Sequence, residues 1–188
     1  MLIFVTGKSG VGKSYFASKL ANELNVKYVN VDIVSKTIYN NLAVVESVKN
    51  LLGKNVVDCN NKINTKQIGK IIFDKNNVEL KQRFYDLTWE YVEPLILNEI
   101  NVDAVVEWSM LPLTGLWKMN ATKILITANN DVRLGKLAER DNVSVNYLKL
   151  RDLSAPDFSK FKFDFVFEND YTMQFVECSI KQIVESLK

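Results

Sequence analysis

Short apolar runs alternate along the chain with longer segments in which apolar residues recur at helical spacing. The apolar runs predict buried strands at residues 2–5, 27–31, 104–106, 123–127 and 163–167. The periodic segments predict helices at residues 13–24, 33–40, 44–52, 65–73, 78–100, 131–139, 144–152 and 171–187. Residues 55–64 are polar and predict a loop or a short hairpin. Strands that alternate with helices are typical of an α/β fold with a mainly parallel sheet.

The first strand and the first helix are joined by a phosphate-binding motif, G-x-x-x-x-G-K-[ST]. Its residues are Gly7, Lys8, Ser9, Gly10, Val11, Gly12, Lys13 and Ser14. Backbone N–H groups of such a loop converge on phosphate oxygens, and the following helix N-terminus adds partial positive charge. We expect Lys13 to reach the β- and γ-phosphates of a nucleotide and Ser14 to bind Mg²⁺. The alternative, a chance match in an ordinary glycine-rich turn, is disfavoured by the strand and helix around it.

The segment between the second and third strands, about residues 33–102, is mostly helical. It is much longer than a simple crossover requires. An insert at this position is typical of kinases that bind a small-molecule acceptor, and the Asp-x-x-Gly and Asn-Lys-x-Asp patterns of GTPases are absent. We therefore predict one P-loop kinase domain with a three-layer α/β fold. Its core would comprise residues 1–32 and 103–188, with a helical acceptor subdomain at about 33–102 and a lid at about 139–152.

The composition excludes several classes of function but does not identify a single one. The net charge is only +2, which does not favour bulk nucleic-acid binding. The sequence has no histidine, so no histidine base, nucleophile or metal ligand is available. Cys59 and Cys178 lack metal or redox spacing and are expected to be reduced thiols. No apolar run is long enough to span a membrane or to act as a signal segment, so we expect a cytoplasmic protein. We expect a monomer, with a weak oligomer as the alternative.

Two carboxylates follow predicted strands, at the edge where parallel sheets bind ligands. Asp32 follows the second strand and is a candidate to accept the proton of an acceptor hydroxyl; its alternative role is the N-cap of the helix at 33–40. Glu107 closes the third strand. It is a candidate to bind the acceptor or to hold a Mg²⁺-bound water, and the alternative is a structural partner of Lys13.

Arginines, which can clamp a phosphate with two hydrogen bonds, are scarce in this sequence. Of the four arginines in the sequence, Arg140 lies just past the predicted helix after the fourth strand, where kinase lids place arginines. Its alternative role is a solvated helix-end arginine paired with Asp141. Lys66 and Lys70 are one turn apart on a predicted helix and are candidates for an acceptor diphosphate, or else an ordinary solvated pair.

Taken in order, the motifs resemble those of the dephospho-CoA kinase family over nearly the whole chain. The P-loop is followed by Asn30-Val31-Asp32-Ile33-Val34, which resembles the family's Asp-Ala-Asp-x-Ile segment. Further matches are Ile68-Gly69-Lys70-Ile71-Ile72-Phe73, Glu93-Pro94-Leu95-Ile96, Arg140-Asp141-Asn142-Val143-Ser144 and Asp164-Phe165-Val166-Phe167-Glu168-Asn169-Asp170. The departures are Asn30 for the first aspartate, Glu93 for a histidine, and the loop at 108–113, which replaces Val-Pro-Leu-Leu-Phe-Glu.

The resemblance implies transfer of the γ-phosphoryl group of ATP, with Mg²⁺, to the ribose 3′-hydroxyl of dephospho-CoA. Asp32 would then be the base, and Lys13 and Arg140 would neutralise charge on the transferring group. The family's glutamine and arginine after the lid are missing, with Arg151-Asp152 as an approximate replacement. The alternatives are another nucleoside or nucleotide kinase, and a non-catalytic nucleotide-binding P-loop protein.

Overall fold

The computed structural model describes residues 1–74 and 77–187. The chain divides into two compact units, which are described separately below. The first comprises Met1–Val31 and Ile100–Lys188, and the second comprises Asp32–Glu99. Among the described residues, no helix combines the length and the apolar character needed to cross a bilayer.

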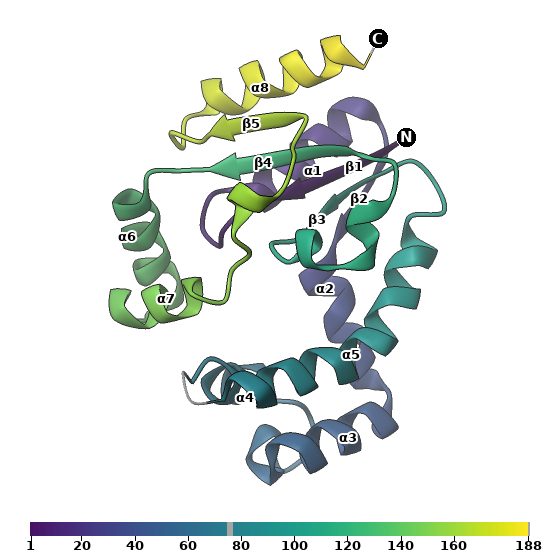
Figure 1. Cartoon of the computed structure of the whole chain (residues 1–188), viewed down its shortest axis with the longest axis vertical. Coiled ribbons are helices and arrows are strands. Elements are labelled where there is room, and N and C mark those ends of the chain that lie inside the picture. Colours follow the sequence, from purple (N-terminus) through teal and green to yellow (C-terminus); the bar gives the residue numbers. More distant parts are fainter. Residues whose placement is uncertain (75–76, 188) are drawn as a thin grey trace. The chain divides into compact units, whose positions relative to one another are not determined.

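The first unit is built on a parallel sheet with strand order β2-β3-β1-β4-β5 (Figure 1). The strands are β1 (Leu2–Thr6), β2 (Lys27–Asn30), β3 (Ala104–Glu107), β4 (Thr122–Thr127) and β5 (Phe165–Glu168). The central strand β1 pairs with β3 on one side and β4 on the other, with Val5 in register with both Glu107 and Ile124. Because all pairs are parallel, the carboxyl ends of the strands share one edge.

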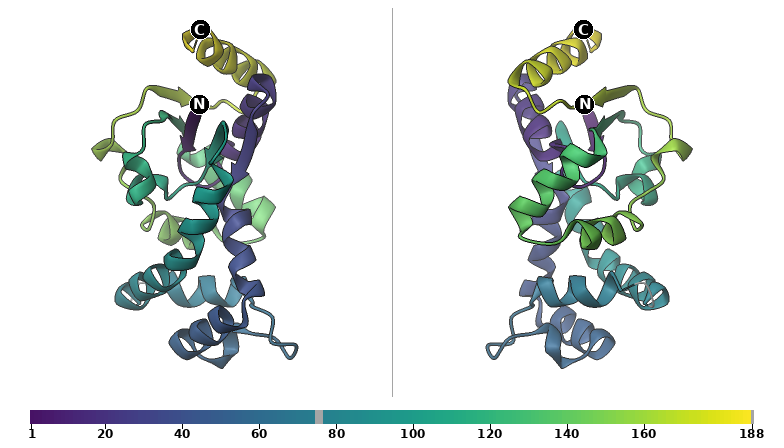
Figure 2. Two further views of the ribbon diagram at one scale, coloured as in Figure 1. Left: turned by 90° about the vertical axis from the view of Figure 1, so that its right-hand side faces the viewer. Right: turned by 90° about the vertical axis from the view of Figure 1, so that its left-hand side faces the viewer.

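Both faces of β1 are covered, which explains its uninterrupted apolar sequence. On one face, Ile3 and Val5 pack in a core with α1 (Lys13–Leu24) and α8 (Met173–Ser186), which Figure 2 shows side by side. On the other face, Phe4 stacks on Trp117 of the short helix η4 (Gly115–Lys118). The predicted α/β fold with a parallel sheet is confirmed.

The helical hairpin that follows β4 belongs to the same unit. It consists of α6 (Asn130–Asp141) and α7 (Val145–Asp152), with Asn129 capping α6 and Ser144 capping α7. Leu134 and Leu137 of α6 pack against Leu148 of α7. The short helices η3 (Leu111–Leu113) and η5 (Phe158–Lys160) complete the unit, and neither was predicted.

The second unit is helical: α2 (Val31–Lys36, of which Val31 still belongs to the first unit), η1 (Thr37–Asn40), α3 (Leu42–Leu52), η2 (Lys54–Val56), α4 (Thr65–Ile72) and α5 (Val78–Glu99). Its apolar interior is formed by buried residues of α3, α4 and α5: Val44, Val45, Val48, Ile68, Ile72 and Phe84. Of the two possibilities predicted for 55–64, a loop or a short hairpin, the structure has the hairpin, with an antiparallel bridge between Val57 and Ile63. The side chain of Asp58 closes its turn by accepting from the N–H groups of Asn60 and Lys62.

Several predicted boundaries differ from the structure. The strand predicted at 27–31 ends at Asn30, and the helix predicted at 33–40 begins at Val31 and is divided into α2 and η1. The next helix, α3, begins at Leu42, because the side chain of Asn41 accepts from the N–H of Ala43. Strand β5 begins at Phe165 rather than Phe163. The ring of Phe163 lies 5.6 Å from that of Trp117, in an aromatic cluster outside the sheet.

Candidate active site

The P-loop turns tightly out of β1 and into α1, as its sequence predicted. Gly12, the residue before α1, has φ of 88°, and a Cβ there would collide with the side-chain amide of Asn169. A Cβ on Gly7 (φ 143°) would collide with the backbone carbonyl of Ile126 in β4. A residue other than glycine would therefore strain both positions and displace neighbouring groups.

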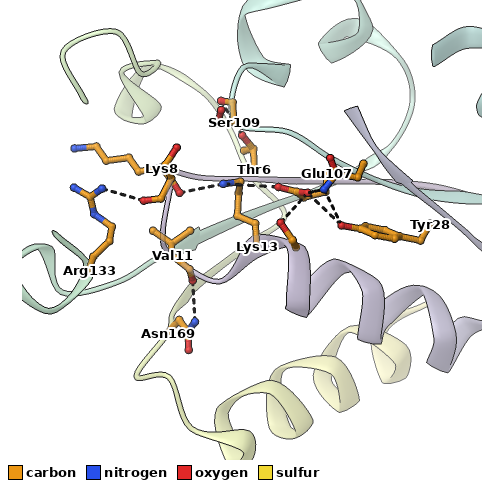
Figure 3. Close-up of polar contacts among 12 residues, drawn as sticks. Thr6, Lys8, Val11, Lys13, Tyr28, Glu107, Ser109, Arg133 and Asn169 are labelled. Atoms are coloured by element: carbon orange, nitrogen blue, oxygen red, sulfur yellow. Dashed lines mark hydrogen bonds and ion pairs between the residues drawn. The ribbon is translucent and has the colours of Figure 1, made fainter. Parts of the chain in front are cut away.

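Side chains from outside the loop hold three successive P-loop carbonyl groups. The carbonyl of Ser9 accepts from Arg133 at 3.0 Å, that of Gly10 from the Tyr171 hydroxyl at 3.0 Å, and that of Val11 from Asn169 at 2.8 Å. Figure 3 shows Arg133 and Asn169 reaching the loop from different elements. In a trans peptide the N–H points away from the carbonyl that precedes it. The N–H groups of Gly10, Val11 and Gly12 therefore point away from these three side chains, which makes them available to an anion.

Lys13 and Glu107 form a buried ion pair at the carboxyl edge of the sheet. The Nζ of Lys13 lies 3.8 Å from Oε1 of Glu107 and donates to the carbonyl of Lys8 at 3.1 Å. Only 7% of Lys13 and 2% of Glu107 is exposed. The sequence left Glu107 with two possible roles, and one of them was a structural partner of Lys13. The structure shows that this pair is formed.

Glu107 is also the centre of a hydrogen-bond network (Figure 3). Its Oε2 accepts from the Ser14 hydroxyl at 3.1 Å, from the Tyr28 hydroxyl at 3.3 Å and from the Asn30 amide at 2.7 Å. Burial, together with the negative charge of Glu107, raises the pKa of the Tyr28 hydroxyl, which therefore stays a donor at neutral pH. Asn30, a departure from the family pattern, thus orients the carboxylate by donating its amide, which an aspartate could not do when ionised.

These oxygens suit Mg²⁺ bound together with a nucleotide. Mg²⁺ prefers oxygen ligands and is commonly held by one or two protein groups plus phosphates and waters. The Ser14 hydroxyl and the Glu107 carboxylate supply such groups, and the described part of the chain contains no cluster of three acidic, cysteine or histidine ligands. The site therefore fits a metal that arrives with its phosphate ligands rather than one held by protein alone.

The predicted lid arginine lies at the end of α6 on the surface. The side chain of Arg140 is 66% exposed, and its Nε donates to Asp141 at 2.7 Å. Hydrogen bonding and the nearby charge of Arg140, with a further contribution from Arg151, lower the pKa of Asp141. This is the geometry of the alternative role, a helix-end pair, and a lid role for Arg140 stays a prediction. Two side-chain nitrogens of Arg151 are buried without a hydrogen-bond partner, although its third lies 3.6 Å from Asp141.

A pocket in the helical unit contains Asp32. Its volume is about 330 Å³, and it is lined by Asp32, Ser35, Lys36, Tyr39, Thr65, Ile68, Gly69, Ile72, Phe73 and Phe84. The two sequence segments that resemble the family in this unit, around Asp32 and at 68–73, thus line one pocket. Asp32 lies in the first turn of α2, which begins at Val31, so the predicted N-cap alternative was wrong.

The lysines predicted for the acceptor are not among the lining residues. Lys66 and Lys70 are exposed on α4, and Lys36 is the lysine that lines the pocket. Burial raises the pKa of Tyr39 to about 12, so its hydroxyl remains protonated beside Asp32 in this pocket. Burial also raises the pKa of Tyr85, and the charge of Asp32 contributes to that shift. Sequence reasoning missed Lys36, although it lies one helical turn after Asp32.

Arg133, Asn169 and Tyr171 were also missed as residues of the phosphate-binding region. Asn169 belongs to a segment that resembles the family motif, and that match was the available signal. For Arg133 the only available signal was that arginine is a rare residue type in this sequence. Tyr171 has a positive φ of 65°, which no sequence pattern indicated.

The fold and this geometry define a P-loop site for nucleotide phosphates, and comparison with known proteins agrees. The chain belongs to the family described as "AAA domain", whose model matches residues 3–148. Over 198 aligned positions it is 24% identical to a dephospho-CoA kinase from Fusobacterium nucleatum subsp. nucleatum, covering 100% of this chain and 98% of that protein.

Solved structures show the same fold. A dephospho-CoA kinase from Campylobacter jejuni superposes with a TM-score of 0.67 at 24% identity, covering 99% of this chain and 96% of that one. The protein TT1252 from Thermus thermophilus superposes with a TM-score of 0.79 at 18% identity, covering 100% and 98% of the two chains. The predicted resemblance to dephospho-CoA kinases is confirmed, and at this identity the chain is a divergent relative.

Proposed function

We propose that the protein transfers the γ-phosphoryl group of ATP to the ribose 3′-hydroxyl of dephospho-CoA. The observation that carries this proposal is the pocket of the helical unit, where Asp32 and the segment that includes Gly69, Ile72 and Phe73 come together. These are the segments through which the acceptor subdomain resembles dephospho-CoA kinases. The P-loop and its Lys13 support phosphoryl transfer from a nucleotide, and the names of the relatives support dephospho-CoA as the acceptor.

In this proposal the sheet unit handles the nucleotide. The N–H groups of the P-loop and the helix N-terminus bind the phosphates, and Lys13 exchanges Glu107 and the Lys8 carbonyl for phosphate oxygens. Ser14 and Glu107 would hold Mg²⁺ or its bound water. When bound, Mg²⁺ neutralises charge on the β- and γ-phosphates. Arg140, on the lid at about 139–152, would meet the transferring group.

The helical unit would bind the acceptor. Asp32 accepts the proton of the attacking hydroxyl, as the catalytic carboxylate of kinases does. Lys36 at the pocket, with Lys66 and Lys70 on α4, offers positive charge for the acceptor's diphosphate. Apolar residues such as Ile68 and Phe84 offer surface for the rest of the acceptor.

A coupled assay of ADP formation tests this directly. Purified protein with ATP and Mg²⁺ is given dephospho-CoA, adenosine or a series of nucleoside monophosphates in parallel. We expect ADP formation that depends on dephospho-CoA, with coenzyme A identified by mass spectrometry. ADP formation with another acceptor would reassign the substrate. Nucleotide binding without turnover on any acceptor would support the non-catalytic alternative.

A further inference from the structure

A buried arginine ties the P-loop to the second helix of the α6–α7 hairpin. Only 1% of Arg133 is exposed, and it is the largest by volume of the fully buried side chains among the described residues. It lies in the first turn of α6, and its guanidinium donates to the Ser9 carbonyl of the P-loop at 3.0 Å. A charge this deeply buried requires partners.

The partners of Arg133 come from both helices of the hairpin. Its guanidinium forms an ion pair with Asp152, the last residue of α7, and its NH1 donates to Oδ1 of the same carboxylate at 3.3 Å. Its Nε and NH2 donate to the side-chain carbonyl of Asn130 at 3.3 and 2.9 Å. The planar fork of the guanidinium is therefore held on two sides while one nitrogen remains directed at the loop.

The stem of Arg133 also shapes the loop. A Cβ on Gly10 would lie 3.3 Å from Cγ of Arg133, so the backbone of Gly10 passes close to the aliphatic part of the arginine. The Ser9 carbonyl that Arg133 holds belongs to the same peptide group as the N–H of Gly10. Rotation of that peptide group would turn the N–H away from the phosphate side and bring a carbonyl oxygen toward the anion.

We propose that Arg133 is a positioning residue of the nucleotide site: it fixes the Ser9–Gly10 peptide for phosphate binding, and Asp152 of α7 fixes Arg133. In this role Arg133 does not contact the nucleotide phosphates; it holds the peptide group whose N–H binds them. The position of α7 therefore influences the conformation of the phosphate-binding loop. This inference rests on the proposed function only in that the P-loop must bind a polyphosphate.

The proposal makes an unusual prediction for Asp152. Removing a negative charge near an anion site strengthens anion binding by simple Coulomb attraction. If Asp152 instead holds Arg133 in place, Asp152→Asn weakens binding, because the guanidinium loses its anchor and the Ser9–Gly10 peptide is free to rotate. The direction of the change in affinity therefore separates the two effects.

The test measures dissociation constants by isothermal titration calorimetry, well below the melting temperature, with MgATP and with inorganic tripolyphosphate plus Mg²⁺. Tripolyphosphate has no base or sugar, so it reports on the loop alone. We expect Arg133→Met to weaken both by about tenfold or more, since a charge-assisted hydrogen bond is lost. Asp152→Asn should weaken both by a factor of about three to ten.

Arg133→Lys separates position from charge, because an ammonium keeps the charge but lacks the planar fork. We expect it to bind tripolyphosphate nearly as weakly as Arg133→Met. The control is Val48→Ala, a buried position of α3 in the helical unit. It should lower the melting temperature and leave both dissociation constants within about twofold of wild type, as expected for an independent site.

The outcomes are distinct. If wild type binds tripolyphosphate and Asp152→Asn binds it equally well or more tightly, the positioning role is overturned and the proposed function stands. Wild-type affinity in Arg133→Lys would likewise overturn it. If wild-type protein binds neither MgATP nor tripolyphosphate, the proposed function and this inference both fail. If Arg133→Met does not fold, the dissociation constants of Asp152→Asn and Arg133→Lys provide the same test.

Discussion

The charged groups of the P-loop region in the sheet unit and those of the acceptor pocket region in the helical unit lie in opposite environments. In the sheet unit, Lys13, Glu107 and Arg133 are almost completely buried, and each has several hydrogen-bond or ion-pair partners. In the helical unit, Asp32, Lys66 and Lys70 are exposed. Buried charges are stable only when they are paired and hydrogen-bonded, whereas exposed charges impose little on the fold.

This difference separates two kinds of functional residue. At the P-loop edge the groups for phosphate are held in place before any ligand binds, which is the arrangement that stabilises developing charge most effectively. A substitution there changes stability and function together. Substitutions of the exposed charges in the helical unit are expected to change function alone. Substitutions in the two units should therefore have separable effects on stability and on turnover.

Lys13→Met should lose turnover by about 10²-fold or more, because the cation on the β- and γ-phosphates is removed. It should also lower the free energy of unfolding by about 3 kcal/mol, since Glu107 is left buried without its cation. Denaturant unfolding and the coupled ADP assay measure the two effects. The control is Lys13→Met combined with Glu107→Gln, which should regain stability without regaining turnover. Near-normal turnover of Lys13→Met would contradict the P-loop assignment.

Asp32→Asn should lose turnover by about 10²-fold, the usual scale for removal of a general base. Asp32 lies in the first turn of α2, where loss of the interaction with the helix dipole costs about 0.5 kcal/mol, so the melting temperature should hardly change. The measurements are kcat and thermal unfolding monitored by circular dichroism. A clearly lower melting temperature with wild-type turnover would show that Asp32 has only a structural role.

Arg140 belongs to the sheet unit but is exposed, and it should behave like the charges of the helical unit. Arg140→Lys keeps the charge and loses the bidentate geometry. It should lower kcat by about tenfold and leave ATP affinity and stability nearly unchanged, because the contact would form only in the closed lid. Equal losses in ATP affinity and in kcat would indicate uniform binding instead. An unchanged kcat would leave Arg140 as a surface partner of Asp141.

The smallest effect is expected for the lysines of the acceptor unit. Lys66→Ala with Lys70→Ala should raise the KM for dephospho-CoA by a few-fold and leave the KM for ATP unchanged; exposed charges contribute about 1 kcal/mol or less each. The matched comparison is Lys36→Ala at the pocket itself. The dependence of acceptor binding on salt should weaken in whichever variant removes the contact. If only Lys36→Ala raises the acceptor KM, Lys66 and Lys70 are not part of the site.

The features that depend on neighbouring residues could be predicted from the sequence. The P-loop with its strand and helix, the helical insert and the hairpin at 55–64 all follow from local spacing, glycine and asparagine positions, and apolar periodicity. The position of Glu107 at the end of β3 was also predictable, because parallel strands bring their carboxyl ends to one edge. These features need no knowledge of which distant segments meet.

The side chains that hold these local features in place could be identified only from the folded structure. Arg133 reaches a carbonyl 124 positions earlier in the chain, and Asn169 reaches one 158 positions earlier. Likewise, Lys36 of α2 lines a pocket together with residues of α4 and α5, whereas Lys66 and Lys70 do not line it. Such contacts depend on the direction of side chains across packed elements, and a helical or strand period specifies a face but not its partner.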